Sequence, residues 1–111
     1  MTLHDTKIIT INLVTGELVE TKIPTKVLDP DKVGVRTPEI SKEVLEEKSI
    51  AISFSKMTDG RAYSLAAKIK EIADGIEIHA IGKINQEICY FLKRSGFDIA
   101  HFESNSEKSI F

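Results

Sequence analysis

The stretch 55–64 brings together side chains whose types and spacing could do chemistry at one place. Lys56 and Arg61 carry positive charge, and Asp59 with Gly60 supplies residues typical of a turn. Backbone amides that open a helix, together with such cations, bind phosphate, sulfite, sulfate or carboxylate groups. Arg61 could hold an oxyanion through two bonds, which a lysine cannot do. We therefore predict a loop that binds a small oxyanion or a partner protein, and its candidate residues are Lys56, Thr58, Asp59, Gly60, Arg61 and Ser64.

The same residues also have a purely structural interpretation. Asp59 can cap a helix, Gly60 can support the turn before it, and Arg61 can pair with an acidic neighbour. The spacing Lys-x-x-Asp-Gly-Arg matches neither the Walker phosphate loop nor the dinucleotide glycine fingerprint. Residue types alone leave the binding and structural interpretations open, and they do not favour nucleotide binding by either device.

Other ionisable side chains form weaker patterns. His79, Lys83 and Arg94 are secondary candidates for the same site, although a hydrogen-bonded histidine with a structural role is the simpler interpretation of His79. The three histidines lie far apart in the sequence, so no metal site is predicted. Cys89 is the single cysteine and cannot form a disulfide within the chain. No flavin, nicotinamide, haem or iron–sulfur signature is present, and no cofactor is identified.

Length and charge limit the class of protein. The chain has 111 residues, which predicts one domain. Its 15 basic and 17 acidic side chains give a net charge of −2, which does not favour general nucleic-acid binding. No apolar run approaches the roughly 20 residues that span a bilayer, and the N-terminus lacks the pattern of a signal peptide. We expect a cytoplasmic protein without a membrane segment.

The N-terminal residues 1–32 predict a β-hairpin followed by a linker. Two runs rich in β-branched residues, 8–13 and 18–23, are separated by a turn at 14–17 that contains a glycine. An isolated hairpin is marginal in water, so it should pack on the rest of the domain or mediate formation of a homodimer. Residues 24–32 are rich in proline and aspartate and look like a linker.

Residues 33–103 predict a repeating strand–helix core, and 104–111 a flexible tail. The expected strands are 33–36, 50–54, 76–81 and 97–102, and the expected helices run through 38–48, 62–73 and 84–94. Helical crossovers imply parallel strands. We predict an α/β fold with a small open parallel sheet of about four strands; a half-barrel completed by a second copy is the alternative. Both place the loops after residues 54 and 81 at one end of the sheet, where open α/β sheets bind ligands.

Three blocks of the sequence resemble a known family. Lys56-Met57-Thr58-Asp59-Gly60-Arg61-Ala62-Tyr63-Ser64 is similar to the block K-F-T-D-G-R-[AG]-Y-S of a bacterial family of unknown molecular function. Residues 33–36 are similar to its L-G-V-R segment, and 78–98 to its stretch that ends in R-R-C-G-F-D. The family carries the label of an oxidoreductase involved in sulfite reduction, and its genes tend to neighbour those for assimilatory sulfite reductase. The resemblance covers about residues 33–103.

The chain departs from the family pattern at four positions. Ser95 stands where the family has cysteine, and His79 stands where it often has arginine. Lys83 and Ile88 replace its usual aspartate or asparagine and its usual glutamine. The second loop therefore matches the family less closely than the first.

The resemblance implies a role in assimilatory sulfur metabolism. Our leading hypothesis is an accessory protein of sulfite reduction that binds a small oxyanion or a component of sulfite reductase through the Lys56–Ser64 loop. The alternative is a small enzyme, an oxidoreductase of sulfur metabolism, that uses the same loop as its active site. In that enzyme Arg61 and Lys56 would hold an oxyanion while Asp59 or His79 moves a proton.

Overall fold

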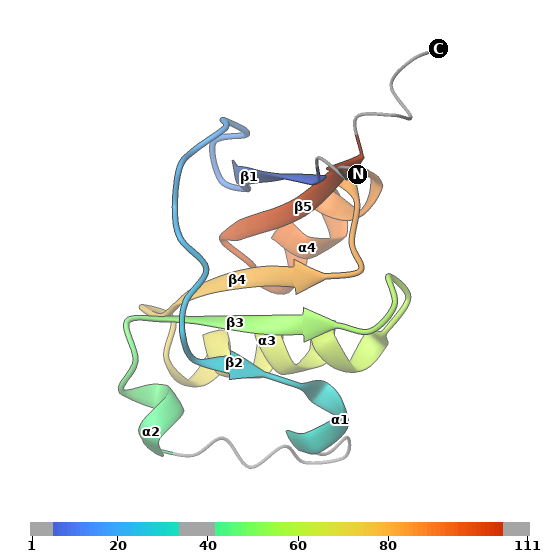
Figure 1. The fold of residues 1–111 in the computed structure, drawn as a ribbon. Helices are drawn as coiled ribbons and strands as arrows, with labels where there is room; N and C mark the ends of the chain where they lie inside the picture. Colours follow the sequence, from blue (N-terminus) through green and yellow to red (C-terminus); the bar gives the residue numbers. More distant parts are fainter. Residues whose placement is uncertain (1–5, 34–41, 106–111) are drawn as a thin grey trace.

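The computed structural model describes residues 6–33 and 42–105, which build an open α/β fold around one mixed sheet (Figure 1). The sheet has five strands in the order β1-β5-β4-β3-β2. Strands β2 to β5 are parallel, and β1 runs antiparallel to β5 at one edge. The strands are β1 (Thr6–Asn12), β2 (Val27–Leu28), β3 (Ser49–Phe54), β4 (Glu77–Gly82) and β5 (Ile99–Asn105).

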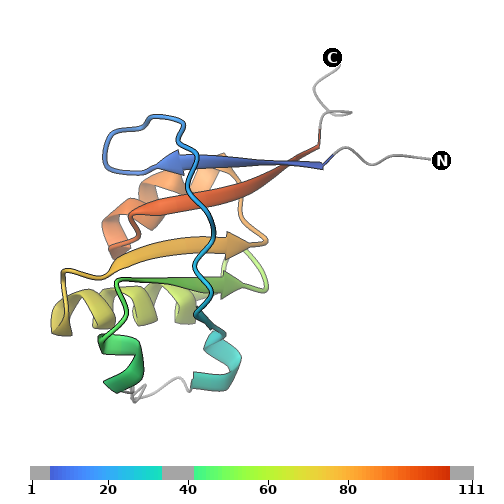
Figure 2. The same ribbon diagram turned by 60° about the vertical axis from the view of Figure 1, so that its left-hand side comes forward.

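Two helices cover one face of this sheet. α3 and α4 lie side by side behind it, and the chain between β1 and β2 crosses the opposite face (Figures 1 and 2). Two short helices lie near β2. The helices are α1 (Pro30–Val33), α2 (Lys42–Leu45), α3 (Gly60–Ile72) and α4 (Cys89–Ser95), with a single 3₁₀ turn η1 (Gln86–Ile88) before α4. No helix in the described ranges is long and apolar enough to cross a membrane.

The core fills the space between the sheet and these helices. Ile50, Ile52 and Phe54 alternate along β3 with residues of the other face, and all three are buried against α3. On α3, Leu65 and Ile69 recur at helical spacing and are buried in the same cluster. Each such side chain contributes about 1.5–3 kcal/mol when it is fully buried, so this layer sets the position of α3 on the sheet.

Most predicted elements of the βα core are confirmed. Strands at 50–54, 76–81 and 97–102 correspond to β3, β4 and β5, and the helix at 62–73 corresponds to α3. β5 extends to Asn105, so residues 104 and 105 of the predicted tail belong to the sheet, where they pair with β1. The open sheet with four parallel strands is also present, but the strand expected at 33–36 is not its first member. β2 takes that place within the predicted linker, while residue 33 ends α1 and 34–36 lie outside the described residues. The start of the helix expected from 38 likewise lies outside them.

The N-terminal hairpin was predicted with a full second strand, and this is wrong. The turn exists, since the Asn12 side chain accepts hydrogen bonds from the Val14 and Thr15 amides at 2.9 and 3.1 Å and Gly16 has φ of 80°. The returning residues 18–23 form no strand: one bridge joins Ile11 to Leu18, with backbone hydrogen bonds from Asn12 to Glu17 at 2.9 Å and from Val19 to Thr10 at 3.0 Å. β1 instead pairs along its whole length with β5, because a seven-residue ladder satisfies the edge of β5 that would otherwise stay open.

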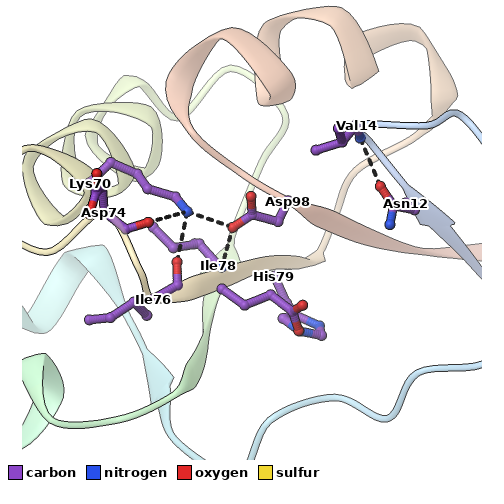
Figure 3. A network of polar contacts seen from close by, with 9 residues as sticks. Asn12, Val14, Lys70, Asp74, Ile76, Ile78, His79 and Asp98 are labelled. Atoms are coloured by element: carbon purple, nitrogen blue, oxygen red, sulfur yellow. Dashed lines mark hydrogen bonds and ion pairs between the residues drawn. The ribbon is translucent and has the colours of Figure 1, made fainter.

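A lysine and an aspartate fix the amino-terminal ends of β4 and β5 (Figure 3). Lys70 Nζ of α3 donates to Asp98 Oδ2 at 2.8 Å and to the carbonyls of Ile76 and Asp74 at 2.7 and 3.3 Å. The same Asp98 oxygen accepts the Ile78 amide at 2.9 Å. This network lies at the opposite end of the sheet from the Lys56–Ser64 loop, and it ties α3 to the sheet.

Candidate functional site

The Lys56–Ser64 loop leaves β3 at the carboxyl end of the parallel strands. β3 ends at Phe54 and α3 begins at Gly60. The loop after β4 reaches the same end, since the Lys83 amide donates to the Phe54 carbonyl at 2.9 Å and Gly82 pairs with Phe54. The structure therefore has the strand–loop–helix order expected for a ligand-binding loop of an open α/β sheet.

Asp59 is the N-cap of α3, and its carboxylate is fully engaged. Its Oδ1 accepts the Arg61 backbone amide at 3.1 Å and Arg61 Nε at 3.0 Å, and its Oδ2 accepts Arg61 Nη2 at 3.1 Å. The side chain is buried, with 5% of the residue exposed. These bonds from Arg61 hold the pKa of the Asp59 carboxyl below its usual value. Asp59 is therefore a charged structural cap, as the structural interpretation of the loop proposed.

Arg61 joins two elements through its guanidinium. Besides its bonds to Asp59, it forms an ion pair with Asp31 of α1. Hydrogen bonds to these two carboxylates raise the pKa of Arg61 above its ordinary value. The positive charge expected to hold an oxyanion is thus offset by two carboxylates within the protein.

The remaining loop candidates face outward. Lys56, Thr58 and Ser64 are exposed, and Lys56 makes no ion pair within the described part of the chain. Gly60 has a negative φ, and a Cβ built there would meet no atom within 4 Å. The backbone of the protein therefore leaves open space in front of Gly60.

A groove of about 550 Å³ opens between this loop and α4. Tyr63 anchors the loop side, because its ring packs edge-on against Phe54 at 5.3 Å and its hydroxyl donates to the Met57 carbonyl at 3.2 Å. The α4 side carries Phe91, which is 57% exposed, and Met57 opposite it is 37% exposed. The groove is lined by Met57, Thr58, Tyr63, Ile88, Phe91, Arg94 and Ser95.

Arg94 is the one charged side chain that lines the groove within the described residues. Its guanidinium lies 5.6 Å from the centre of the Tyr90 ring, and Nη1 makes a long 3.4 Å bond to the Tyr90 hydroxyl. No carboxylate of the described residues pairs with it. The structure thus brings one secondary candidate, Arg94, into the same groove as Thr58 of the loop. Lys83 lies at the same end of the sheet but does not line the groove.

His79 lies on the other face of the sheet. Ile78 and Ala80 pack in the core beneath the helices, so His79 between them points away from α3 and from the loop. Its Nδ1 lies 2.7 Å from His101 Nε2, and its Nε2 lies 2.8 Å from Glu77 Oε1. The structure therefore does not bring His79 to the predicted site.

His101 extends this contact into a hydrogen-bonded network across three strands, and the sequence analysis did not predict this network. Its Nδ1 lies 2.9 Å from the Thr10 hydroxyl of β1. With both rings neutral, one set of tautomers satisfies every contact: Thr10 donates to His101, His101 to His79, and His79 to Glu77. Burial, with a further contribution from His79, lowers the pKa of His101 to about 4. The sequence signal for this network was the alternation that places His79 and His101 on the same face of adjacent strands.

The described residues were also compared with the requirements of a metal site and of a reactive thiol. No group of three or more histidine, cysteine, aspartate or glutamate side chains among these residues could hold a metal ion. Cys89 is half-buried in the first turn of α4, and burial raises the pKa of its thiol.

The fold and the groove define a small α/β domain with an open mixed sheet and a surface groove at the carboxyl end of its parallel strands. The chain belongs to the family described as bacterial protein of unknown function (DUF934), whose model matches residues 31–110. This match confirms the resemblance to a bacterial family of unknown function and includes the loop, α4 and the groove between them. No curated protein and no solved structure matches the chain.

Proposed function

We propose that this chain is a cytoplasmic accessory protein of assimilatory sulfite reduction, which binds a partner protein through the Lys56–Ser64 loop and α4. The groove between them is the observation that carries the proposal. It exposes Met57 and Phe91 beside Arg94, a cation without a carboxylate partner in the described ranges. Exposed aromatic and arginine side chains next to one another are the residue types that dominate protein–protein interfaces.

A small oxyanion is the second ligand predicted for this loop, and the local charges favour it less. An oxyanion held by Arg61 would have to compete with Asp59 and Asp31, which already accept the guanidinium bonds. Asp59 would also place a negative charge beside the incoming anion. Within the loop this leaves Lys56, whose flexible side chain gives little geometric specificity.

The enzyme alternative requires Asp59 or His79 to move a proton at the loop. Both oxygens of Asp59 accept hydrogen bonds from Arg61, and its pKa is lowered, so it is a weak base. His79 is on the opposite face of the sheet, with partners of its own. The geometry therefore supports a binding module better than an active site at this loop.

The sulfite-reduction context rests on the resemblance of residues 56–64 and 78–98 to the family pattern. These two blocks meet in space, because one forms the loop and the start of α3 and the other contains β4 and α4. The partner proposed on this basis is a component of the assimilatory sulfite reductase system.

A reciprocal pull-down at low salt tests this proposal, with the parent chain and two variants as bait. The parent should retain sulfite reductase components, and Phe91→Ala should lose most of them because it removes the exposed aromatic wall of the groove. Ile72→Ala is the matched control, since Ile72 is 50% exposed at the far end of α3 and should behave as the parent. Failure of the parent to retain any component in either direction would count against the proposal.

Thermal shifts with sulfite, sulfate and phosphate test the oxyanion alternative, since a ligand of the folded state raises the melting temperature.

A further inference from the structure

We propose that the groove takes an acidic segment of the partner that carries a large apolar side chain, which inserts between Met57 and Phe91 while an adjacent carboxylate pairs with Arg94. This inference rests on the proposed function and names the chemistry of the partner. It follows from three properties of the groove, which are its openness, its apolar walls and its single sign of charge.

The shape of the groove fits a segment of a protein better than an enclosed small ligand. Its volume of about 550 Å³ lies within the range of small-molecule sites. Such sites bury most of their ligand, whereas Phe91 and Met57 on the two walls are 57% and 37% exposed. The groove therefore stays open to solvent along its walls, which suits side chains projecting from a partner.

The walls of the groove are apolar and adaptable. Met57, Tyr63, Ile88 and Phe91 supply most of the lining. A methionine thioether adapts to side chains of different shape and packs well on aromatic rings. Tyr63 is held in place by Phe54 and by its bond to the Met57 carbonyl, so one wall is preorganised. A leucine, methionine or phenylalanine of a partner fits these walls.

Charge selects an acidic partner. Arg94 lines the groove, and neither aspartate nor glutamate is among the described residues that line it. Lys56, next to Met57 in the chain, is exposed and makes no ion pair in the described part of the protein. Stacking on Tyr90 holds the Arg94 guanidinium at 5.6 Å from the ring centre and leaves donors for a carboxylate. Arg94 therefore gives the described lining of the groove a positive charge, although the whole chain has a net charge of −2.

A second copy of the chain fits the groove less well. A two-fold contact through this surface would bring the two Arg94 side chains toward each other, and the described lining offers no carboxylate to compensate. The proposed occupant is therefore a different protein.

Fluorescence polarisation with labelled synthetic peptides tests the inference. The probe is a short peptide with phenylalanine and leucine flanked by aspartate and glutamate; one control peptide replaces the acids by lysine, and another replaces the apolar pair by alanine. The acidic apolar peptide should bind the parent, and each control should bind at least tenfold more weakly. Arg94→Gln should weaken the acidic peptide at least tenfold, about 1.4 kcal/mol, and reduce the salt dependence of binding. Lys68→Gln, an exposed lysine on α3 outside the groove, removes the same charge and should have no effect.

Several results would overturn the inference. One is that the lysine peptide binds as tightly as the acidic peptide. Another is that Arg94→Gln has no effect although its circular dichroism matches the parent's. A third is that the acidic peptide does not bind at all. Competition by phenylacetate as strong as that by the peptide would assign the groove to a small carboxylate. A dimer of the parent that Phe91→Ala dissociates would assign it to a second copy. If sulfite reductase components are retained but no peptide shows a charge preference, the inference fails while the proposed function stands. If the acidic peptide binds but the pull-down retains no sulfite reductase component, the inferred chemistry of the groove stands and the proposed partner is wrong.

Discussion

Arg61 shows why residue type is a weak guide to a ligand site. Its guanidinium lies in the predicted loop, yet Asp59 and Asp31 accept its hydrogen bonds. Arg94 is more exposed to an incoming group, because its neighbours are Tyr90 and the groove. The contact between Arg61 and Asp59 could be predicted, since the two residues are two positions apart at a helix start. The contacts with Asp31 and across the groove could not, because they depend on how α1, α3 and α4 pack.

His101 makes the stability of the protein depend on pH in a defined window. Its pKa in the folded protein is lowered to about 4 from its ordinary value of 6.5. Between these values the unfolded chain binds a proton that the folded chain does not, so acidification favours unfolding. The free energy of unfolding should fall by up to about 1.4 kcal/mol per pH unit as pH drops from 6.5 toward 4. Well above 6.5, where this histidine is neutral in the unfolded chain too, it should contribute no pH dependence.

Urea unfolding of the parent and of His101→Gln across this window measures the effect. The glutamine keeps a hydrogen-bonding side chain beside Thr10 and His79 but does not titrate. Its stability should therefore change less between pH 6.5 and 4. The lowered pKa of Asp59 acts below its ordinary value of 3.8 and so falls outside the window. The same slope in both proteins would show that the buried histidine chain is not the source.

At the scale of elements, the local periodicity of apolar residues predicted the strands and the helix that are defined within a single segment. β3, β4, β5 and α3 follow from short apolar runs and helical spacing within each segment. The partner of β1 could not be predicted, because the Thr10–His101 contact spans 91 residues of chain and the pattern of β1 fits a hairpin equally well. β2 was missed because two residues are too short to show any alternation.

At the scale of elements, Gly82 at the end of β4 has no room for a side chain. It ends β4 with φ of 98°, and a Cβ there would lie 2.5 Å from the Phe54 carbonyl oxygen and 2.8 Å from its nitrogen. Both atoms belong to the backbone of β3, so neither can move aside without shifting the strand. Gly82→Ala should lower the free energy of unfolding by at least about 1 kcal/mol, the lower range for a residue held in a sparsely populated conformation. Gly60→Ala is the matched control, since Gly60 has a negative φ and open space before it. Denaturant unfolding that finds the two variants equally stable would contradict this reading of the β3–β4 contact.

At the scale of the whole molecule, the family region does not contain the complete sheet. The match begins at residue 31, within α1, and therefore includes β3, β4 and β5 but neither β1 nor β2. These two outer strands come from residues 6–28 and pair with β5 and β3. Both edges of the sheet thus depend on the part of the chain that precedes the matched region.

The chain from residue 31 onward should consequently fold poorly by itself. Without β1, the edge of β5 loses a seven-residue ladder and His101 loses its bond to Thr10. An unpaired edge of this kind is a template for association with other chains. We expect this piece to have a lower melting temperature than the full chain and to elute as aggregates in size-exclusion chromatography with light scattering. Thr10→Val in the full chain separates the loss of the bond to His101 from the loss of the β1–β5 ladder, because it removes the hydroxyl but leaves β1 in place. This variant should remain as monodisperse as the parent. A monodisperse truncated chain that melts with the parent would show that β1 and β2 are both dispensable for folding, and the edge of β5 would then be free to accept another strand.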